Sequence, residues 1–166
     1  MPVNFCFPEN CKVVNGYAPR VGAAAAVTGA YISLKNIQRA WVVFHYFQAD
    51  ANAITFNVLK ATDVAASGSI ATDVLMPIWS NLACAVSDLL VRRTDAISYA
   101  AGTGAASKMI IMEVDPDALG QLAGVQYDCI AGYSTAIAAA QYLGITYVLQ
   151  PRYQSRVLTQ PTVVTD

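Results

Sequence analysis

The chain has one histidine, His45, and few other side chains that could act as catalysts. A serine or cysteine hydrolase needs a histidine beside its nucleophile, and no nucleophile motif accompanies His45. The residue lies within a run of alternating side chains, most of them apolar, which favours a core or inter-sheet histidine over a general base. We therefore expect no catalytic residues and no enzymatic activity.

The acidic residues also offer few candidates for catalysis, because Glu9 and Glu113 are the only glutamates. A glycosidase with paired carboxylates would have to rely on aspartates, and most of these lie where predicted strands begin or end. Aspartate at such positions is typical of turns. Asp115 and Asp117 flank a proline and could reach a hard cation such as calcium, but no further acidic ligand follows nearby.

The cysteines and glycines do not form a cofactor motif either. The four cysteines are one close pair and two isolated residues, Cys6, Cys11, Cys84 and Cys129. Zinc sites usually have two close pairs, so free thiols that pack as small hydrophobes are expected, which fits a reducing compartment. Gly102 and Gly104 lack the rest of a nucleotide-binding fingerprint. The sequence predicts no metal and no cofactor.

The elements that would position any functional residue have a β pattern. Residues 39–48 alternate with both faces largely apolar, and a turn separates them from residues 54–58, so the two segments are predicted to form a hairpin. Further strands are expected at residues 31–35, 74–79, 89–99, 108–114, 126–133 and 142–150. Eight closely connected strands without a long amphipathic helix predict an all-β, two-sheet β-sandwich that is jelly-roll-like. An immunoglobulin-like sandwich is the alternative.

Residues 1–30 have no strand or helix periodicity and are interrupted by prolines and glycines. They are predicted to be an extended N-terminal arm, followed by the sandwich domain at 31–153 and a C-terminal tail at 154–166. Burying the arm's large apolar side chains, at about 2 kcal/mol each, would nearly balance an ordering cost of about 1 kcal/mol per residue. We therefore expect the arm to order on a partner, with these interface residues: Val3, Phe5, Phe7, Val13, Val14 and Tyr17.

Composition also points to partners. Only 13% of the residues are charged, against about 25% in ordinary domains. A surface so poor in charge is expected to be partly hidden by association, as a dimer or a trimer. The scattered basic residues and net charge of −1 exclude an electrostatic footprint for nucleic acid.

Arg92 and Arg93 are the only adjacent basic residues. They would point to opposite faces of a regular strand, so one must face inward, pair with a carboxylate or mark an edge strand. Asp95 is a candidate partner. The long uncharged run at 129–151 contains polar residues throughout and is interpreted as a loop and a buried strand, so no membrane segment is expected.

Four runs between Lys35 and Tyr153, about three quarters of the chain, resemble small virion proteins of tailed phages. The runs are Trp41-Val42-Val43-Phe44, Met76-Pro77-Ile78-Trp79-Ser80-Asn81, Arg93-Thr94-Asp95-Ala96 and Tyr147-Val148-Leu149-Gln150-Pro151-Arg152-Tyr153. None is a catalytic signature. The resemblance implies a structural protein of the head region, where cement and decoration proteins are often jelly rolls.

The expected function is therefore that of a capsid cement or decoration protein. It would be synthesised in the host cytoplasm, bind the outside of the head and stabilise it by bridging subunits of the major capsid protein. Attachment at several points would multiply a modest contact per subunit. The alternatives are a tail or neck component of the virion and a carbohydrate-binding sandwich displayed on it.

Overall fold

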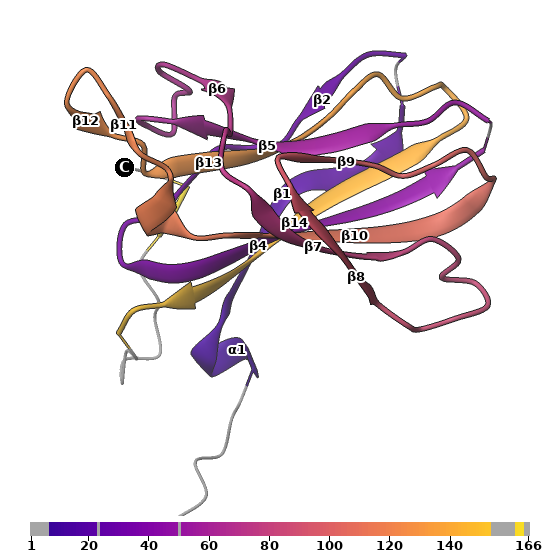
Figure 1. Ribbon diagram of the computed structural model, residues 1–166, viewed down its shortest axis with the longest axis horizontal. Coiled ribbons are helices and arrows are strands. Elements are labelled where there is room, and N and C mark those ends of the chain that lie inside the picture. Colours follow the sequence, from indigo (N-terminus) through magenta and orange to yellow (C-terminus); the bar gives the residue numbers. More distant parts are fainter. Residues whose placement is uncertain (1–6, 23, 50, 154–161, 165–166) are drawn as a thin grey trace, which may run out of the picture.

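The computed structural model describes residues 7–22, 24–49, 51–153 and 162–164. Most of them belong to two antiparallel sheets that face each other (Figure 1). The first, named here the β4 sheet, has in spatial order β1 (Lys12–Val21), β14 (Tyr142–Pro151), β4 (Ile37–Gln48), β10 (Ala106–Val114), β7 (Met76–Asn81) and β8 (Val91–Ala96).

The second, the β5 sheet, has in order β2 (Val27–Thr28), β13 (Cys129–Ser134), β5 (Thr55–Ala61) and β6 (Ile70–Ala71), with β3 (Ile32–Ser33) on β13 and β9 (Ser98–Ala100) on β5. A separate small hairpin joins β11 (Gln121–Leu122) to β12 (Val125–Gln126). One helical turn, α1 (Phe7–Asn10), precedes β1 outside the two layers, and a 3-10 turn, η1 (Pro116–Ala118), follows β10 (Figure 1).

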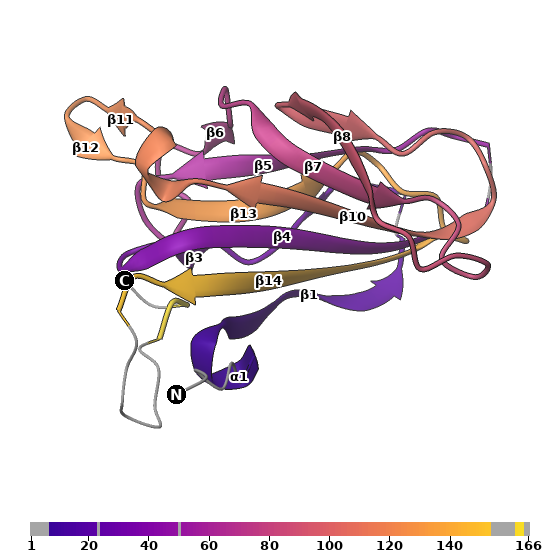
Figure 2. The ribbon, with the colours of Figure 1, turned by 60° about the horizontal axis from the view of Figure 1, so that its bottom comes forward.

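The strand pairs are nested along the chain. β1 pairs with β14, β2 and β3 with β13, β4 with β10, and β5 with β9, and these pairs alternate between the sheets. This is one long antiparallel ribbon wrapped into two layers, which is the jelly-roll arrangement. The prediction of a jelly-roll sandwich is confirmed, and the immunoglobulin-like alternative is not found. β7 and β8, inserted between β6 and β9, extend the β4 sheet beyond β10 (Figure 2).

Two predictions about strand pairing are wrong. β4 and β5 do not form a hairpin, because β4 lies between β14 and β10 and its connection to β5 crosses to the other sheet. The predicted strand at 89–99 is two strands, which change sheets at Ile97. Both errors follow from the wrapped ribbon, in which sequence neighbours often lie in opposite layers.

The prediction of an N-terminal arm over residues 1–30 is wrong for residues 12–21, which form β1 at one edge of the β4 sheet, and for residues 27–28, which form β2 in the β5 sheet. Pro19 is tolerated in β1 because an edge strand has one side without a ladder partner. Register shifts between Asn15 and Tyr17 and between Tyr17 and Arg20 interrupt the pairing with β14. These irregularities interrupt the alternation of inward and outward side chains, so the sequence of β1 does not show the period-2 pattern of a strand.

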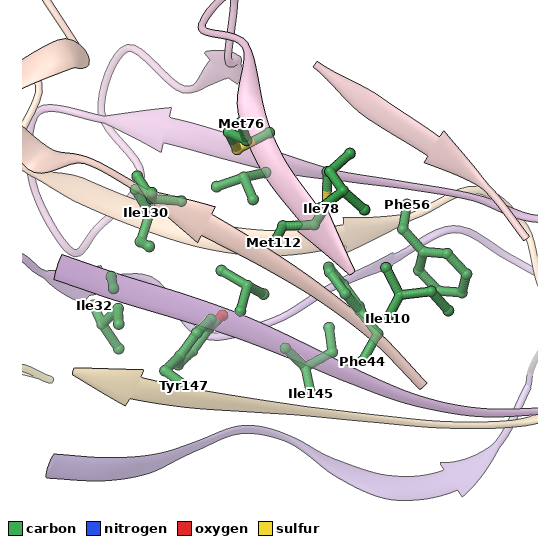
Figure 3. Close-up of a cluster of buried hydrophobic side chains, with 14 of the residues drawn as sticks. Ile32, Phe44, Phe56, Met76, Ile78, Ile110, Met112, Ile130, Ile145 and Tyr147 are labelled. Carbon is green, nitrogen blue, oxygen red and sulfur yellow. The ribbon is translucent and has the colours of Figure 1, made fainter. Parts of the chain in front are cut away.

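Alternate residues of the facing strands fill the space between the sheets (Figure 3). Phe44 on β4 and Phe56 on β5 meet across the layers with ring centroids 4.9 Å apart. Burial of each such side chain stabilises the fold by about 2 kcal/mol. Near the C-terminus, Val163 is buried in the same core, and its carbonyl accepts a hydrogen bond from the Ser33 amide at 2.7 Å.

Tyr147 on β14 joins the two layers. Its hydroxyl donates to the carbonyl of Ala30 at 2.8 Å and accepts from the amide of Gly132, on β13, at 3.0 Å. Gly16 and Gly29 make room for the ring and hydroxyl, because a Cβ on either would lie within 2.6 Å of a Tyr147 atom. Burial raises the pKa of Tyr147 to about 12. The side chain thus acts as a neutral cross-link between the sheets.

In the described part of the chain, no helix has the length and apolar character that a membrane span requires.

Candidate interaction surface

The side chains that could take part in catalysis or metal binding are dispersed over the fold. His45 is exposed on the side of β4 that faces away from the β5 sheet, so the prediction of a core or inter-sheet histidine is wrong. Asp115 forms an ion pair with Arg39 at 3.2 Å, and Asp117 pairs with Arg152. Among the described residues, no group of three potential metal ligands comes together. Cys11 and Cys84 are free thiols, and Cys129 is buried on β13.

Two lysines are buried at opposite ends of the sandwich. Lys108, at the start of β10, donates to the Gln48 side chain and to the carbonyl of Ala101 at 2.8 Å, and burial lowers its pKa. Lys60, on β5, donates to Asp73 at 2.5 Å and to the carbonyl of Leu119 at 2.8 Å. Each ammonium group ties loops to a strand, so both lysines serve the fold.

The Lys60 contact gives a testable pH dependence. Its hydrogen bond and charge hold the pKa of Asp73 below the ordinary value of 3.8. The stabilisation is present above the unfolded-state pKa and is lost as the pH falls from about 4 through the folded-state value. We expect Asp73→Asn to reduce the loss of melting temperature between about pH 5 and pH 3, measured by calorimetry. The exposed Asp88→Asn is the control, and an acid response of Asp73→Asn equal to that of the wild type would contradict the assignment.

The side of the β4 sheet that faces away from the core, named here the outer face, is largely apolar. Cross-strand partners share a face of a sheet, so the pairing register identifies its members. Its apolar side chains include Val13, Val21, Trp41, Val43, Phe47, Trp79, Met109, Ile111, Tyr142 and Val148.

The outer face carries few charges, and those it has are engaged. Glu113 accepts from the Trp41 indole at 3.0 Å and pairs with Arg39 at 3.5 Å. Phe47 and Tyr142, 42% and 50% exposed, form an aromatic pair with centroids 6.4 Å apart. A contiguous apolar surface of this kind marks an interaction site more often than a free surface.

One end of the outer face is hollowed. A depression of about 270 Å³ is lined by His45, Phe47 and Tyr142 among others, and a neighbouring one of about 610 Å³ lies between Met109 and the loop from β7 to β8. Val86 on that loop is the most exposed large apolar side chain among the described residues, at 86%. The two depressions are therefore bordered by apolar side chains that are exposed to water.

The predicted interface residues do not lie on one surface. Phe7 on α1 and Val13 on the outer face are exposed, whereas Val14 and Tyr17 pack against the core. Val3 and Phe5 lie outside the described residues. Sequence reasoning missed most of the outer face, because strands with two apolar faces do not indicate which face is covered.

A second exposed surface, named here the edge surface, surrounds β8 and was also missed. It consists of Leu75, Leu89, Leu90, Val91, Arg92, Asp95 and Ile97. Arg92 stacks over the Trp79 ring at 4.9 Å and pairs with Asp95, while Arg93 donates to the Ser80 hydroxyl at 2.7 Å. The two arginines thus take different sides of an edge strand, and Asp95 is the partner of one, as predicted.

A scan against protein-family models found no match, nor did a search of curated protein sequences. Among solved structures, the chain is similar to the SPBc2 prophage-derived protein YomS, with 7% identity and a TM-score of 0.40 over 84% of this chain and 91% of that chain. It is also similar to the coat protein of Tobacco streak virus, with 14% identity and a TM-score of 0.34 over 95% of each chain. Likenesses of this degree carry no weight for the function of this chain.

Proposed function

We propose that the chain is a structural protein of a phage particle, and that it acts as a cement or decoration protein on the outside of the head. The outer face carries the proposal, because an apolar sheet face on a sandwich poor in charge is suited to lasting contact with other subunits. The sequence runs that resemble tailed-phage virion proteins support the same class. In this role the chain bridges subunits of the major capsid protein and associates with copies of itself.

Contact at several points gives such a protein its affinity for the shell. A shell presents many equivalent sites, and a subunit bound at two of them dissociates far more slowly than one bound at a single site. The outer face supplies a broad area, and Phe7 together with the residues before it supplies a second contact. Bridging in this way stabilises the shell without a chemical reaction.

The test is binding to shells assembled from the major capsid protein alone, measured by co-sedimentation. Phe47→Glu is expected to weaken retention about tenfold or more, since a charge would have to be buried where an aromatic group now packs. Val125→Glu, on the exposed β11–β12 hairpin, is the matched control and is expected to bind like the wild type. Equal retention of Phe47→Glu would remove the outer face from the contact.

Removal of residues 1–10 examines the N-terminal contact. The truncation ends before β1, because residues 12–21 belong to the sheet and their loss would disturb the fold. We expect the truncated protein to remain folded but to leave the shell more readily on heating. Equal retention of full-length and truncated protein would exclude the N-terminal segment from the contact, and failure of every form to bind would favour a tail or neck position.

A further inference from the structure

The two edges of the β4 sheet differ in their capacity to accept another strand (Figure 2). At one edge, β1 contains Pro19 and two register shifts, devices that protect an edge from pairing. At the other edge, β8 contains no proline and pairs only with β7 in the described part of the chain. The free side of β8 is therefore the edge that is open to a partner.

The edge surface is apolar at both ends. At one end lie Leu75 and Ile97, 66% and 47% exposed, brought together because the adjoining residues Met76 and Ala96 are paired. At the other end lie Leu90 and Val91, both 39% exposed. Two apolar ends with a polar middle form a pattern that can match a reversed copy of itself.

Opposite charges occupy the middle. Arg92 and Asp95 bond to each other and are similarly exposed, 44% and 46%. Residues three apart point to opposite sides of a regular strand, but β8 shifts its register on β7 between the partners of Ile78 and Met76. That irregularity brings the carboxylate to the side of Arg92, so both charges are available at the same surface.

We propose that β8 pairs antiparallel with β8 of a second copy, about a two-fold axis at Arg93. Because Thr94 and Asp95 together lie opposite one residue of β7, Arg92 then faces Asp95 of the partner subunit, and Leu90 faces Ile97 of the partner subunit. Each contact occurs twice, as a two-fold interface requires. The Arg93 side chains that meet at the axis are each held by the Ser80 hydroxyl of their own chain, at 2.7 Å.

The dimer continues the β4 sheet through both copies and leaves both outer faces uncovered. This inference rests on the self-association in the proposed function and gives it a surface. It is tested in solution without shells, so that its outcome is separate from that of shell binding.

The test uses two charge variants of the full chain, Arg92→Asp and Asp95→Arg. Each gives like charges at both symmetric contacts, so each alone is expected to dimerise about tenfold or more weakly than the wild type in sedimentation velocity.

Mixing the two variants restores opposite charges at both contacts. The aspartate introduced by Arg92→Asp meets the arginine introduced by Asp95→Arg, and the unchanged Asp95 of the first variant meets the unchanged Arg92 of the second. Heterodimers of wild-type affinity are therefore expected in native mass spectrometry. Within each chain the like charges persist, so rescue on mixing reports only the contact between chains.

Arg152→Asp is the matched control, since Arg152 forms an exposed pair with Asp117 away from β8. It is expected to dimerise like the wild type. A monomeric wild type at every concentration, unchanged dimerisation of the two charge variants, or a mixture without heterodimers would each overturn the proposal.

Discussion

A phenylalanine in place of Tyr147 is expected to lower the free energy of unfolding by about 2–4 kcal/mol. The substitution leaves the ring in place and removes only the hydroxyl, which contacts the Ala30 carbonyl and the Gly132 amide. The buried Gly132 amide then loses its partner at a cost of about 1–3 kcal/mol, and the carbonyl of the exposed Ala30 loses a hydrogen bond worth about 1 kcal/mol. Urea denaturation with an unchanged slope would measure the loss as a shift in midpoint.

Tyr142→Phe is the matched control for this measurement. Tyr142 lies on the same strand, but its side chain is half exposed, so water satisfies the hydroxyl and a change below about 0.5 kcal/mol is expected. If Tyr147→Phe were as small in effect as Tyr142→Phe, the hydroxyl would not be the link between the layers.

Alanine at Gly132 is expected to destabilise the fold by about 1–3 kcal/mol, the usual cost of overpacking. A Cβ there would lie 2.9 Å from atoms of Ile145 and Val42 and 3.1 Å from Phe44, all on the opposite sheet. These side chains are fully buried, and protein interiors are packed closely enough that a shift of this size carries a cost. The same denaturation experiment measures the effect.

Gly104→Ala serves as its control, because nothing lies within 4 Å of a Cβ at that loop position. That variant is expected to be neutral or slightly stabilising, since alanine restricts the unfolded chain. Equal stability of Gly132→Ala and Gly104→Ala would mean that the layers separate more easily than their packing indicates.

Local alternation is enough to predict the strands but not their partners. Residues 39–48 are recognisable as a strand because both faces are apolar, and for the same reason the inward face cannot be identified, which misplaces His45. The false hairpin with residues 54–58 has a similar origin, because closeness in sequence favours pairing without requiring it. The true partners of β4 are β10 and β14, far along the chain.

The candidate surfaces required tertiary information. Val13 is notable in the sequence for its apolar character, but its place on the outer face depends on pairing with Val148, at the other end of the chain. The edge surface depends on which strand ends the sheet, and the order of strands is not encoded in any local pattern. Composition indicates that apolar surface is hidden by partners, yet it cannot locate that surface.

The nested strand pairs also affect how the protein folds as it is made. Among the described strands, β1 is synthesised first and its partner β14 last. The β4 sheet cannot close until β14 has been made, and pairing of strands so far apart in the sequence is slow. Until β14 is released, apolar strands stay exposed to neighbouring chains, a condition that promotes aggregation. Yield in a cell should therefore improve when fewer unfinished chains are present at once or when a chaperone holds them.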